Sequence, residues 1–395
     1  MDIRRCCALG LAIIVVALPA HVSAGLPRGS DHEVVGSIEV SEVGGLGRIE
    51  INDDLAAVLQ RDEGIVSLVD VSDPAKPKVL GAYDDDARQS LDGDIAFSSD
   101  GRYVIYARQT VQFSLDGVHV VDVSDPSAPR IAFYQPAGGT LRVAHHDDGT
   151  NEWVVAMDAI GGIVVYRFEP TTGALAPVFA SPQPVSSKVG GPSSAGIVIQ
   201  EDPIEKKTLL YASSGGSGLE IFDFSDPTSP VLVDAWNDFG LAEVEVSVTG
   251  KKRTVFAASE YWFDAQQEPV IVRLDASDLG AIKEMGHLSM SCRPEDGYRV
   301  QGMTLVGKDL YVAHSTVGLL RFSGPRDKVP SFVPFARASR NDGARVLEGP
   351  YVFDVEAAGD HLYVTDAATG VLSLLERTSK PRSGTAGGAA GACPT

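Results

Sequence analysis

The stretch Asp70-Val71-Ser72-Asp73-Pro74 decides the fold of this sequence, because it recurs at residues 122–126 and, with phenylalanine in place of valine, at residues 223–227. Each copy follows a run of apolar residues and precedes a second proline. Near-copies at a regular interval indicate one supersecondary unit repeated along the chain. The spacing predicts a unit of roughly 50 residues, with one degenerate copy between the second and the third.

Four further units complete the set. Residues 164–170 hold the degenerate copy, which keeps the apolar run and the closing acid-proline pair but has lost the first aspartate. Residues 270–278 keep the aspartates and replace the proline with leucine, while residues 319–325 and 371–375 keep mainly the apolar strand. Seven units therefore cover nearly all of the chain after residue 33.

The inside of each unit has the pattern of short strands. Around the second copy, β-rich runs at residues 95–97, 103–107, 118–123 and 130–134 alternate with clusters of Gly, Asp, Ser and Pro. No stretch of helical period lies between these runs. Four short antiparallel strands repeated seven times are typical of a β-propeller, whose sheets pack around a central channel. We therefore predict an all-β, seven-bladed β-propeller of four-stranded antiparallel blades.

The repeated pattern resembles a known family. The apolar strand, the Asp-Val-Ser-Asp-Pro string, the second proline and the following Val-Leu-Gly strand are similar to the LVIVD-repeat proteins. The resemblance is strong over residues 64–83, 117–134 and 218–235 and weaker in the other four units. It implies a secreted or surface β-propeller of bacterial or archaeal type, and it brings no general catalytic motif with it.

The repeated string has two interpretations. Asp and Ser side chains accept hydrogen bonds from nearby backbone amides, and proline presets the backbone angle of a tight turn, so the string predicts a turn built from local parts. The alternative is a ring of carboxylates that binds cations on one face, but three well-kept copies out of seven make a poor ring. We favour the turn.

The chain ends predict how the ring closes. Residues 351–376 supply only three strands, while residues 34–38 resemble residues 79–83, the outer strand of the first full unit. The N-terminal segment is therefore expected to complete the last blade and to remove an open sheet edge. The propeller would span residues 25–377, and the Gly/Ala/Ser/Pro-rich residues 378–395 have the composition of a flexible tail.

The N-terminus has the features of a signal peptide. Two arginines precede the apolar run Leu9–Leu18, which is too short to span a bilayer, and small residues precede Gly25. Removal of residues 1–24 predicts a protein exported to the periplasm or the medium without a membrane anchor. Cys292 and Cys393 would remain, either bridged to each other, as an oxidising compartment favours, or unpaired, or linked to another molecule.

The charge balance narrows the range of partners. The formal net charge is −20, with 53 acidic against 33 basic residues. Such a surface repels nucleic acid and anionic membranes, so neither is expected as a partner. A solvated acidic surface that aids solubility is the preferred interpretation, and we expect a monomer.

Partner-binding residues are expected in loops, because the strands of a propeller are occupied with packing. One loop holds three consecutive aromatic residues, Tyr261, Trp262 and Phe263, flanked by acids. Large rings supply contact area at low entropy cost, so we predict that these residues bind a protein or carbohydrate partner. The alternative is that the rings tuck under the loop as a small apolar cluster.

Two further stretches have the residue types of metal ligands. Asp84, Asp85 and Asp86 carry the oxygens that calcium prefers, but they lack the alternating spacing of a calcium loop, so a solvated acidic loop is preferred and no cofactor is expected. His145 and His146 are adjacent. Neighbouring residues of a strand point to opposite sides, so these two imidazoles are not expected to share a metal.

Charged residues recur where each inner strand is expected to begin. Such residues can pair with each other across the axis, since buried charges are usually partnered. The alternative is an active-site or ligand-binding mouth, which fold analogy alone supports. The residues are Arg48, Asp94, Arg142, Glu243, Arg299 and Asp354.

The motifs of common hydrolases and redox proteins are absent: the sequence contains no Gly-x-Ser-x-Gly, His-Glu-x-x-His or Cys-x-x-Cys. We therefore predict an exported, non-catalytic β-propeller that acts as a binding or interaction scaffold. The alternative is an extracytoplasmic hydrolase or lactonase-like, metal-dependent propeller enzyme with its site at the channel mouth.

Overall fold

The described part of the chain consists almost entirely of antiparallel β-sheet. Its strands form seven four-stranded sheets, which we call blades 1 to 7, and one two-stranded sheet. Within this part no helix is long and apolar enough to cross a membrane. The computed structural model describes residues 32–42, 45–61, 63–84, 90–110, 117–137, 140–158, 162–181, 195–214, 218–236, 240–259, 270–289, 300–315, 318–323, 331–333, 340–341, 346–347 and 351–377.

The strands of each blade follow one another in the sequence except in blade 7. Blade 1 contains β2 (Leu46–Asn52), β3 (Leu55–Gln60), β4 (Ile65–Asp70) and β5 (Lys78–Tyr83); blade 2 contains β6 (Ser90–Phe97), β7 (Tyr103–Thr110), β8 (Gly117–Asp122) and β9 (Arg130–Pro136). Blade 3 contains β10 (Thr140–Asp147), β11 (Glu152–Asp158), β12 (Gly162–Glu169) and β13 (Ala174–Ala180); blade 4 contains β14 (Ala195–Asp202), β15 (Lys207–Ser214), β16 (Gly218–Asp223) and β17 (Val231–Trp236).

The second half continues the same order. Blade 5 contains β18 (Leu241–Thr249), β19 (Lys252–Ser259), β20 (Val270–Asp275) and β21 (Lys283–Ser289); blade 6 contains β22 (Val300–Val306), β23 (Asp309–His314), β24 (Gly318–Ser323) and β25 (Ser331–Phe332). Blade 7 contains β28 (Val352–Ala358), β29 (His361–Asp366), β30 (Val371–Arg377) and β1 (His32–Glu39), while β26 (Arg340–Asn341) and β27 (Val346–Leu347) form the small separate sheet.

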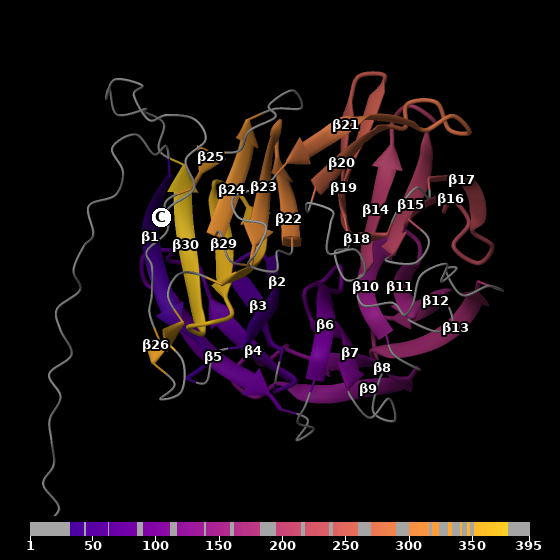
Figure 1. Cartoon of the computed structure of the whole chain (residues 1–395). Coiled ribbons are helices and arrows are strands. Elements are labelled where there is room, and N and C mark those ends of the chain that lie inside the picture. Colours follow the sequence, from indigo (N-terminus) through magenta and orange to yellow (C-terminus); the bar gives the residue numbers. More distant parts are fainter. Residues whose placement is uncertain are drawn as a thin grey trace, which may run out of the picture.

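The blades are arranged around a common axis (Figure 1). The innermost strands are β2, β6, β10, β14, β18, β22 and β28, and each contacts the inner strands of the two neighbouring blades, so that the seven close a circle. The predicted seven-bladed β-propeller of four-stranded antiparallel blades is therefore confirmed.

The apolar core is divided among the seven junctions between blades. Because alternate residues of a strand face opposite sides of its sheet, each blade supplies side chains to two junctions. Between blades 1 and 2, for example, Leu59 and Leu68 pack with Val104 and Tyr106, and all four side chains are buried. Similar clusters fill the other six junctions. A chain of this length is thereby stabilised without one oversized core.

The N-terminal strand completes the last blade, as predicted. β1 pairs antiparallel with β30, with Val34 opposite Leu375 and Ile38 opposite Leu372. Its side chains enter both neighbouring junctions: Val34 packs against the cluster between blades 6 and 7, and Ile38 against the cluster between blades 7 and 1. The first and the last strand that the structure describes therefore share one sheet, and β1 pairs an edge that β30 would otherwise leave open.

The repeated aspartates form turns, as predicted. In blade 2, the Asp122 carboxylate accepts hydrogen bonds from the Ser124 amide at 3.0 Å and the Ser124 hydroxyl at 2.5 Å. Burial disfavours ionisation of Asp122, but the bonds from Ser124, together with Arg130 and Arg102, outweigh it and lower the pKa to about 2. In blades 1, 4 and 5 a serine amide likewise donates to the aspartate two positions before it.

These turns also explain the glycine of the Val-Leu-Gly strand. A Cβ atom built on Gly81 of β5 would lie 2.6 Å from the carbonyl oxygen of Pro126, in the turn of the next blade. A Cβ atom on Gly36 of β1 would likewise lie 2.0 Å from the carbonyl oxygen of Pro74. Glycine at these positions lets the outer strand of one blade approach the turn of the next.

Candidate functional site: a charged ring in the central channel

Five of the six predicted ring residues lie together at the end of the channel where the inner strands begin. Arg48, Asp94, Arg142, Glu243 and Asp354 come from blades 1, 2, 3, 5 and 7, and all five line one cavity. At the corresponding strand positions, blades 4 and 6 carry Gly196 and Gly302. The sixth predicted residue, Arg299, lies outside the described residues.

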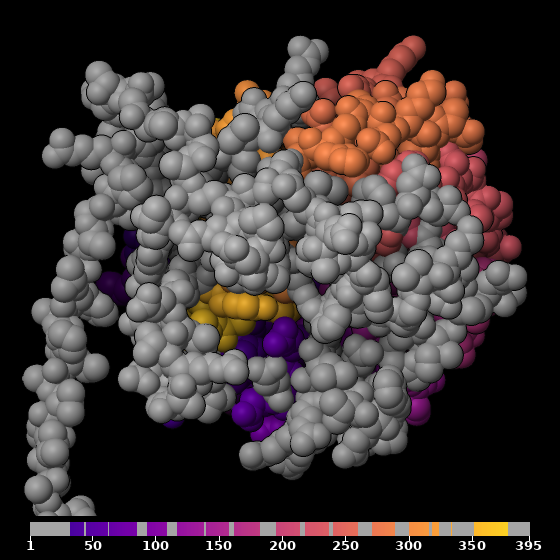
Figure 2. Space-filling model, in the orientation of Figure 1, coloured from indigo at the N-terminus to yellow at the C-terminus, as the bar shows by residue number. Residues whose placement is uncertain are grey.

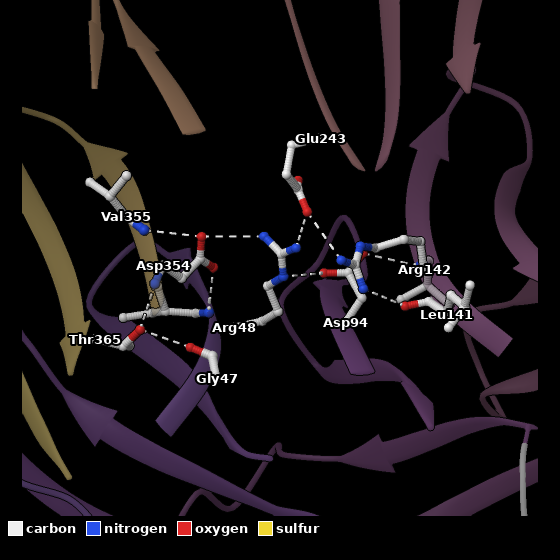
Figure 3. Close-up of polar contacts among 11 residues, drawn as sticks. Gly47, Arg48, Asp94, Leu141, Arg142, Glu243, Asp354, Val355 and Thr365 are labelled. Atoms are coloured by element: carbon white, nitrogen blue, oxygen red, sulfur yellow. Dashed lines mark hydrogen bonds and ion pairs between the residues drawn. The ribbon is translucent and has the colours of Figure 1, made fainter. Parts of the chain in front are cut away.

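The ring residues bind one another (Figure 3). Arg48 forms ion pairs with Glu243 across the channel and with Asp354 at 3.4 Å, and its Nε lies 4.0 Å from Asp94. Arg142 donates to the same oxygen of Glu243 at 3.0 Å. Glu243 thus binds both guanidinium groups. The network links blades 1, 3, 5 and 7 and, through Asp94, blade 2.

Backbone contacts orient the ring. The Ile49 amide donates to Asp354 at 3.0 Å, and the Val143 amide donates to Asp94 at 3.2 Å. Arg142 donates to the carbonyl oxygen of Leu141 at 2.8 Å. Because each of these bonds crosses between blades or turns a side chain back to its own strand, the ring charges are held in fixed positions.

A second level of charge lies further along the same strands. Glu50, Glu245 and Glu356 each follow a ring residue by two positions and line the same cavity, which has a volume of about 370 Å³. Burial raises the pKa of all three, and the neighbouring carboxylates raise it further. For Glu356 the pKa is raised to about 8, by burial first and then by Asp354.

The ring carboxylates also differ from ordinary aspartates. Burial raises the pKa of Asp94 to about 6, although Arg142 and Arg48 act in the opposite direction. Burial likewise raises the pKa of Asp354 against the effect of Arg48. The cavity therefore has six carboxyl groups and two guanidinium groups, and the raised pKa values of Asp94 and Glu356 favour the protonated form of these two carboxyl groups.

The glutamate level was missed by the sequence analysis, although a signal for it exists. The pairs 48/50, 243/245 and 354/356 are each separated by two residues, and residues i and i+2 of a strand face the same side. Once a ring residue is assigned to the channel, the acid two positions later follows it there. The repeats are most similar to one another in the outer turns, not in the inner strands that line the channel.

The two histidines lie apart, as predicted. Both belong to β10, but the His145 ring contacts Glu152 at 2.7 Å and Phe168, while the His146 ring contacts Phe224 of the next blade. The two rings therefore have different partners, His145 within blade 3 and His146 in blade 4. Among the residues that the structure describes, no group of three His, Cys, Asp or Glu is arranged to hold a metal ion.

The remaining predicted site residues are mostly outside the described residues. Asp84 is exposed directly after β5, whereas Asp85 and Asp86 fall outside. So do the aromatic residues Tyr261, Trp262 and Phe263 and the cysteines Cys292 and Cys393. These predictions therefore stand as proposals, and so do residues 1–24 as a signal peptide.

Comparison with known proteins identifies the repeat. Residues 52–85, 113–134 and 210–238 match the model of the LVIVD repeat. Together with the fold, this defines the chain as a seven-bladed β-propeller that carries LVIVD repeats. None of the curated proteins matches the chain.

Solved structures match the fold across most of the chain. The β-propeller domain of Cps50 (Swd1) from Myceliophteria thermophila covers 87% of this chain and 99% of its own, with a TM-score of 0.58 and 11% identity. Sqt1 from Saccharomyces cerevisiae covers 89% of this chain and 99% of its own, with a TM-score of 0.54 and 12% identity. At such identities the similarity is one of fold alone.

Proposed function

We propose that this protein is an exported, non-catalytic β-propeller that binds a protein or carbohydrate partner, working as a monomer. The observation that carries the proposal is the pairing of the ring charges with one another. Arg48 and Arg142 are both bound to Glu243, and Arg48 is also bound to Asp354. Charged side chains that are already paired with one another hold the blades together. Such a network supports a rigid frame better than it supports a reactive centre.

If the blades form a rigid frame, we expect the loops between the strands to recognise the partner. β19 ends at Ser259 and β20 begins at Val270, so residues 260–269 connect the second and third strands of blade 5. In a four-stranded antiparallel blade the end of the second strand and the start of the third lie at the same end as the start of the inner strand, where the ring lies. We assign partner binding to Tyr261, Trp262 and Phe263 in this connection, because aromatic anchors dominate most interfaces.

Export belongs to the proposal as well. The charged start, short apolar run and small residues before Gly25 support cleavage after residue 24. The expected product is soluble in the periplasm or the medium. N-terminal sequencing of the protein recovered from the producing cells tests this part: a first residue at or near Gly25 supports it, and recovery of Met1 in the cytoplasm contradicts it.

The binding proposal is tested by capture. The protein starting at Gly25 is immobilised and exposed to the exported fraction of the producing cells, and the captured molecule is then titrated against wild type, Trp262→Ala and Leu232→Ala. Leu232 is 51% exposed on the outer strand β17, so its variant controls for loss of an apolar side chain elsewhere. We expect Trp262→Ala to weaken binding by about 2 kcal/mol or more, roughly 30-fold, and Leu232→Ala to leave it unchanged.

The same preparation distinguishes the enzyme alternative. A hydrolase or lactonase-like enzyme at the channel mouth would retain stoichiometric metal after purification and would lose activity when a ring carboxylate such as Asp94 is replaced. Metal analysis of the purified protein and an ester and lactone screen of wild type against Asp94→Asn supply this comparison. Bound metal with Asp94-dependent turnover would overturn the non-catalytic assignment.

A further inference from the structure

Blade 1 meets blade 7 where β2 contacts β28 and β29, a contact that we call the closing junction. Of the strands of blade 7, only β1 comes from the N-terminal part of the chain; β28, β29 and β30 are joined to blade 1 through the pairing of β1 with β30 and through the closing junction. Figure 2 shows parts of blade 7 in yellow beside blade 1 in indigo near the centre of the ring. Ring closure therefore depends on noncovalent contacts.

Three polar contacts hold the closing junction together. Asp354 of β28 binds Arg48 at 3.4 Å and accepts a hydrogen bond from the Ile49 amide at 3.0 Å. The Thr365 hydroxyl of β29 donates to the carbonyl oxygen of Gly47 at 2.8 Å. An apolar cluster that includes Leu46 and Tyr363 lies beside them.

One step deeper in the channel, the same two strands bring like charges together. Glu50 of β2 and Glu356 of β28 follow Arg48 and Asp354 by two positions, on the same faces. After burial, Glu356 is the strongest influence that raises the pKa of Glu50. Both side chains line one cavity and come from two inner strands in contact, so full ionisation of both places two negative charges on opposite sides of the closing junction.

We propose that the closing junction is a pH-sensitive device, in which Glu50 and Glu356 hold the ring closed while they share protons and loosen blade 7 from blade 1 when both ionise. The contacts of Asp354 resist this repulsion but do not neutralise it, because Arg48 already forms ion pairs with Asp354 and Glu243. Repulsion between the two carboxylates acts directly between β2 and β28, which no connecting segment joins; only β1 links blade 7 to blade 1 along the chain.

The other groups that face this pair reinforce the effect. β6 contributes Asp94, and β18 contributes Glu243 and Glu245. β10 contributes Arg142 and His145, and burial lowers the pKa of His145, which favours its uncharged form. β14 and β22 present the uncharged Val198 and Met303 to the same cavity. Arg142 is bound to Glu243 at 3.0 Å. Besides the pair itself, four carboxyl groups and two guanidinium groups line the cavity, so ionisation of the pair adds negative charge to a site that already has an excess of acids.

The direction of the pH dependence follows from the pKa shifts. The pKa of Glu356 is raised from its ordinary value of 4.5 to about 8, and burial also raises the pKa of Glu50. A group whose pKa is higher in the folded than in the unfolded protein stabilises the fold fully below its unfolded pKa. That stabilisation is lost as pH rises from about 4.5 through about 8.

The first test compares melting temperature between pH 5 and pH 9 for wild type, Glu50→Gln/Glu356→Gln and Glu376→Gln. Glu376 is exposed on β30 of the same blade, so its variant removes charge without touching the channel. We expect the melting temperature of wild type and Glu376→Gln to fall by several degrees as pH rises through 8. The double variant should show a flatter profile and the higher melting temperature at pH 9.

The second test locates the loosening. Hydrogen exchange, corrected for the intrinsic pH dependence of the chemical step, is followed for peptides from β28 and β30 and, as a reference, from β15 of blade 4. Between pH 6 and pH 9 we expect exchange in blade 7 to rise about tenfold or more in wild type and little in the double variant. Parallel pH profiles of wild type and double variant, or equal acceleration in blades 4 and 7, would overturn the proposal.

Discussion

Arg48 of blade 1 and Glu243 of blade 5 form an ion pair across the axis of the propeller, between two blades that are not neighbours in the ring. Glu243 also binds Arg142 of blade 3, so one carboxylate connects three inner strands. Contacts between adjacent blades set the spacing of neighbours, whereas this pair fixes the width of the channel. A frame of this kind presents its loops at constant separation, which suits a binding protein.

Removal of the central guanidinium should destabilise the propeller strongly. Arg48→Met leaves the largely buried carboxylates of Glu243, Asp354 and Asp94 with one cation fewer, and we expect a loss of about 3 kcal/mol in the free energy of unfolding, measured with urea. Arg167→Met is the matched control, because Arg167 is exposed and binds only Asn151 among the contacts the structure describes. Equal effects of the two variants would refute the role of the ring in stability.

Deletion of the N-terminal strand should open the last blade. A chain starting at Ser41 lacks β1, so the β30 edge is unpaired and the apolar contacts of Val34 and Ile38 are lost. We expect the melting temperature to fall by several degrees or the protein to aggregate, compared with a chain starting at Gly25. Unchanged melting and solubility would show that the β1–β30 pairing contributes little to ring closure.

Replacement of a turn aspartate should cost stability and nothing else. In Asp122→Ala the Ser124 amide and hydroxyl lose their acceptor, and we expect a destabilisation of about 0.5–2 kcal/mol, comparable to the loss of a helix cap. Asp360→Ala, in an exposed turn of blade 7, is the control. A variant that melts normally but loses its partner would contradict the structural role of the turn.

The effect of Asp122 should also depend on pH. Its pKa is lowered from 3.8 to about 2, so the stabilisation it gives is present above about pH 3.8 and is lost as pH falls through 2. The difference in unfolding free energy between wild type and Asp122→Ala should therefore narrow between pH 4 and pH 2. A constant difference over this range would mean that the ionised carboxylate is not what stabilises the turn.

A side chain at Gly81 should destabilise the propeller, because the outer strand lies very close to the turn of the next blade there. Gly81→Ala places a methyl group 2.6 Å from the Pro126 carbonyl oxygen, which is backbone and cannot move away without shifting the turn. We expect a destabilisation of about 1–3 kcal/mol, as for other overpacked sites, in thermal or urea unfolding. Ala82→Ser, one residue along on an exposed side chain, should be nearly neutral.

The fold could be predicted from the sequence because its signals are local. Asp70, Asp122 and Asp223 each form a turn with residues next to them in the sequence. Each copy of the motif therefore predicts the same turn at the same place in its blade. The N-terminal strand was likewise predictable, since Gly36 occupies in β1 the position of Gly81 in β5. In both cases, the turns and the N-terminal strand, a few adjacent residues are enough to predict the local structure.

The site was only partly predictable because it is formed by residues far apart in the chain. Arg48 and Glu243 are separated by 195 positions, and nothing in either stretch of sequence specifies the other as its partner. The position of each residue in the repeat predicts that it faces the channel, but it does not predict which charges pair. Glu50, Glu245 and Glu356 share a strand face with the ring residues two positions before them, but their charges come together only when strands from different blades converge.

The most direct test of the central claim is a hydrogen-exchange footprint of the protein in complex with its captured partner. If the propeller is a frame that binds through its loop face, protection should concentrate at residues 260–269, with the adjoining ends of β19 and β20, and the exchange of the inner strands should stay the same. Protection concentrated instead at the aspartate turns of residues 70–78, 122–130 and 223–231, at the opposite end of the blades, would contradict the account.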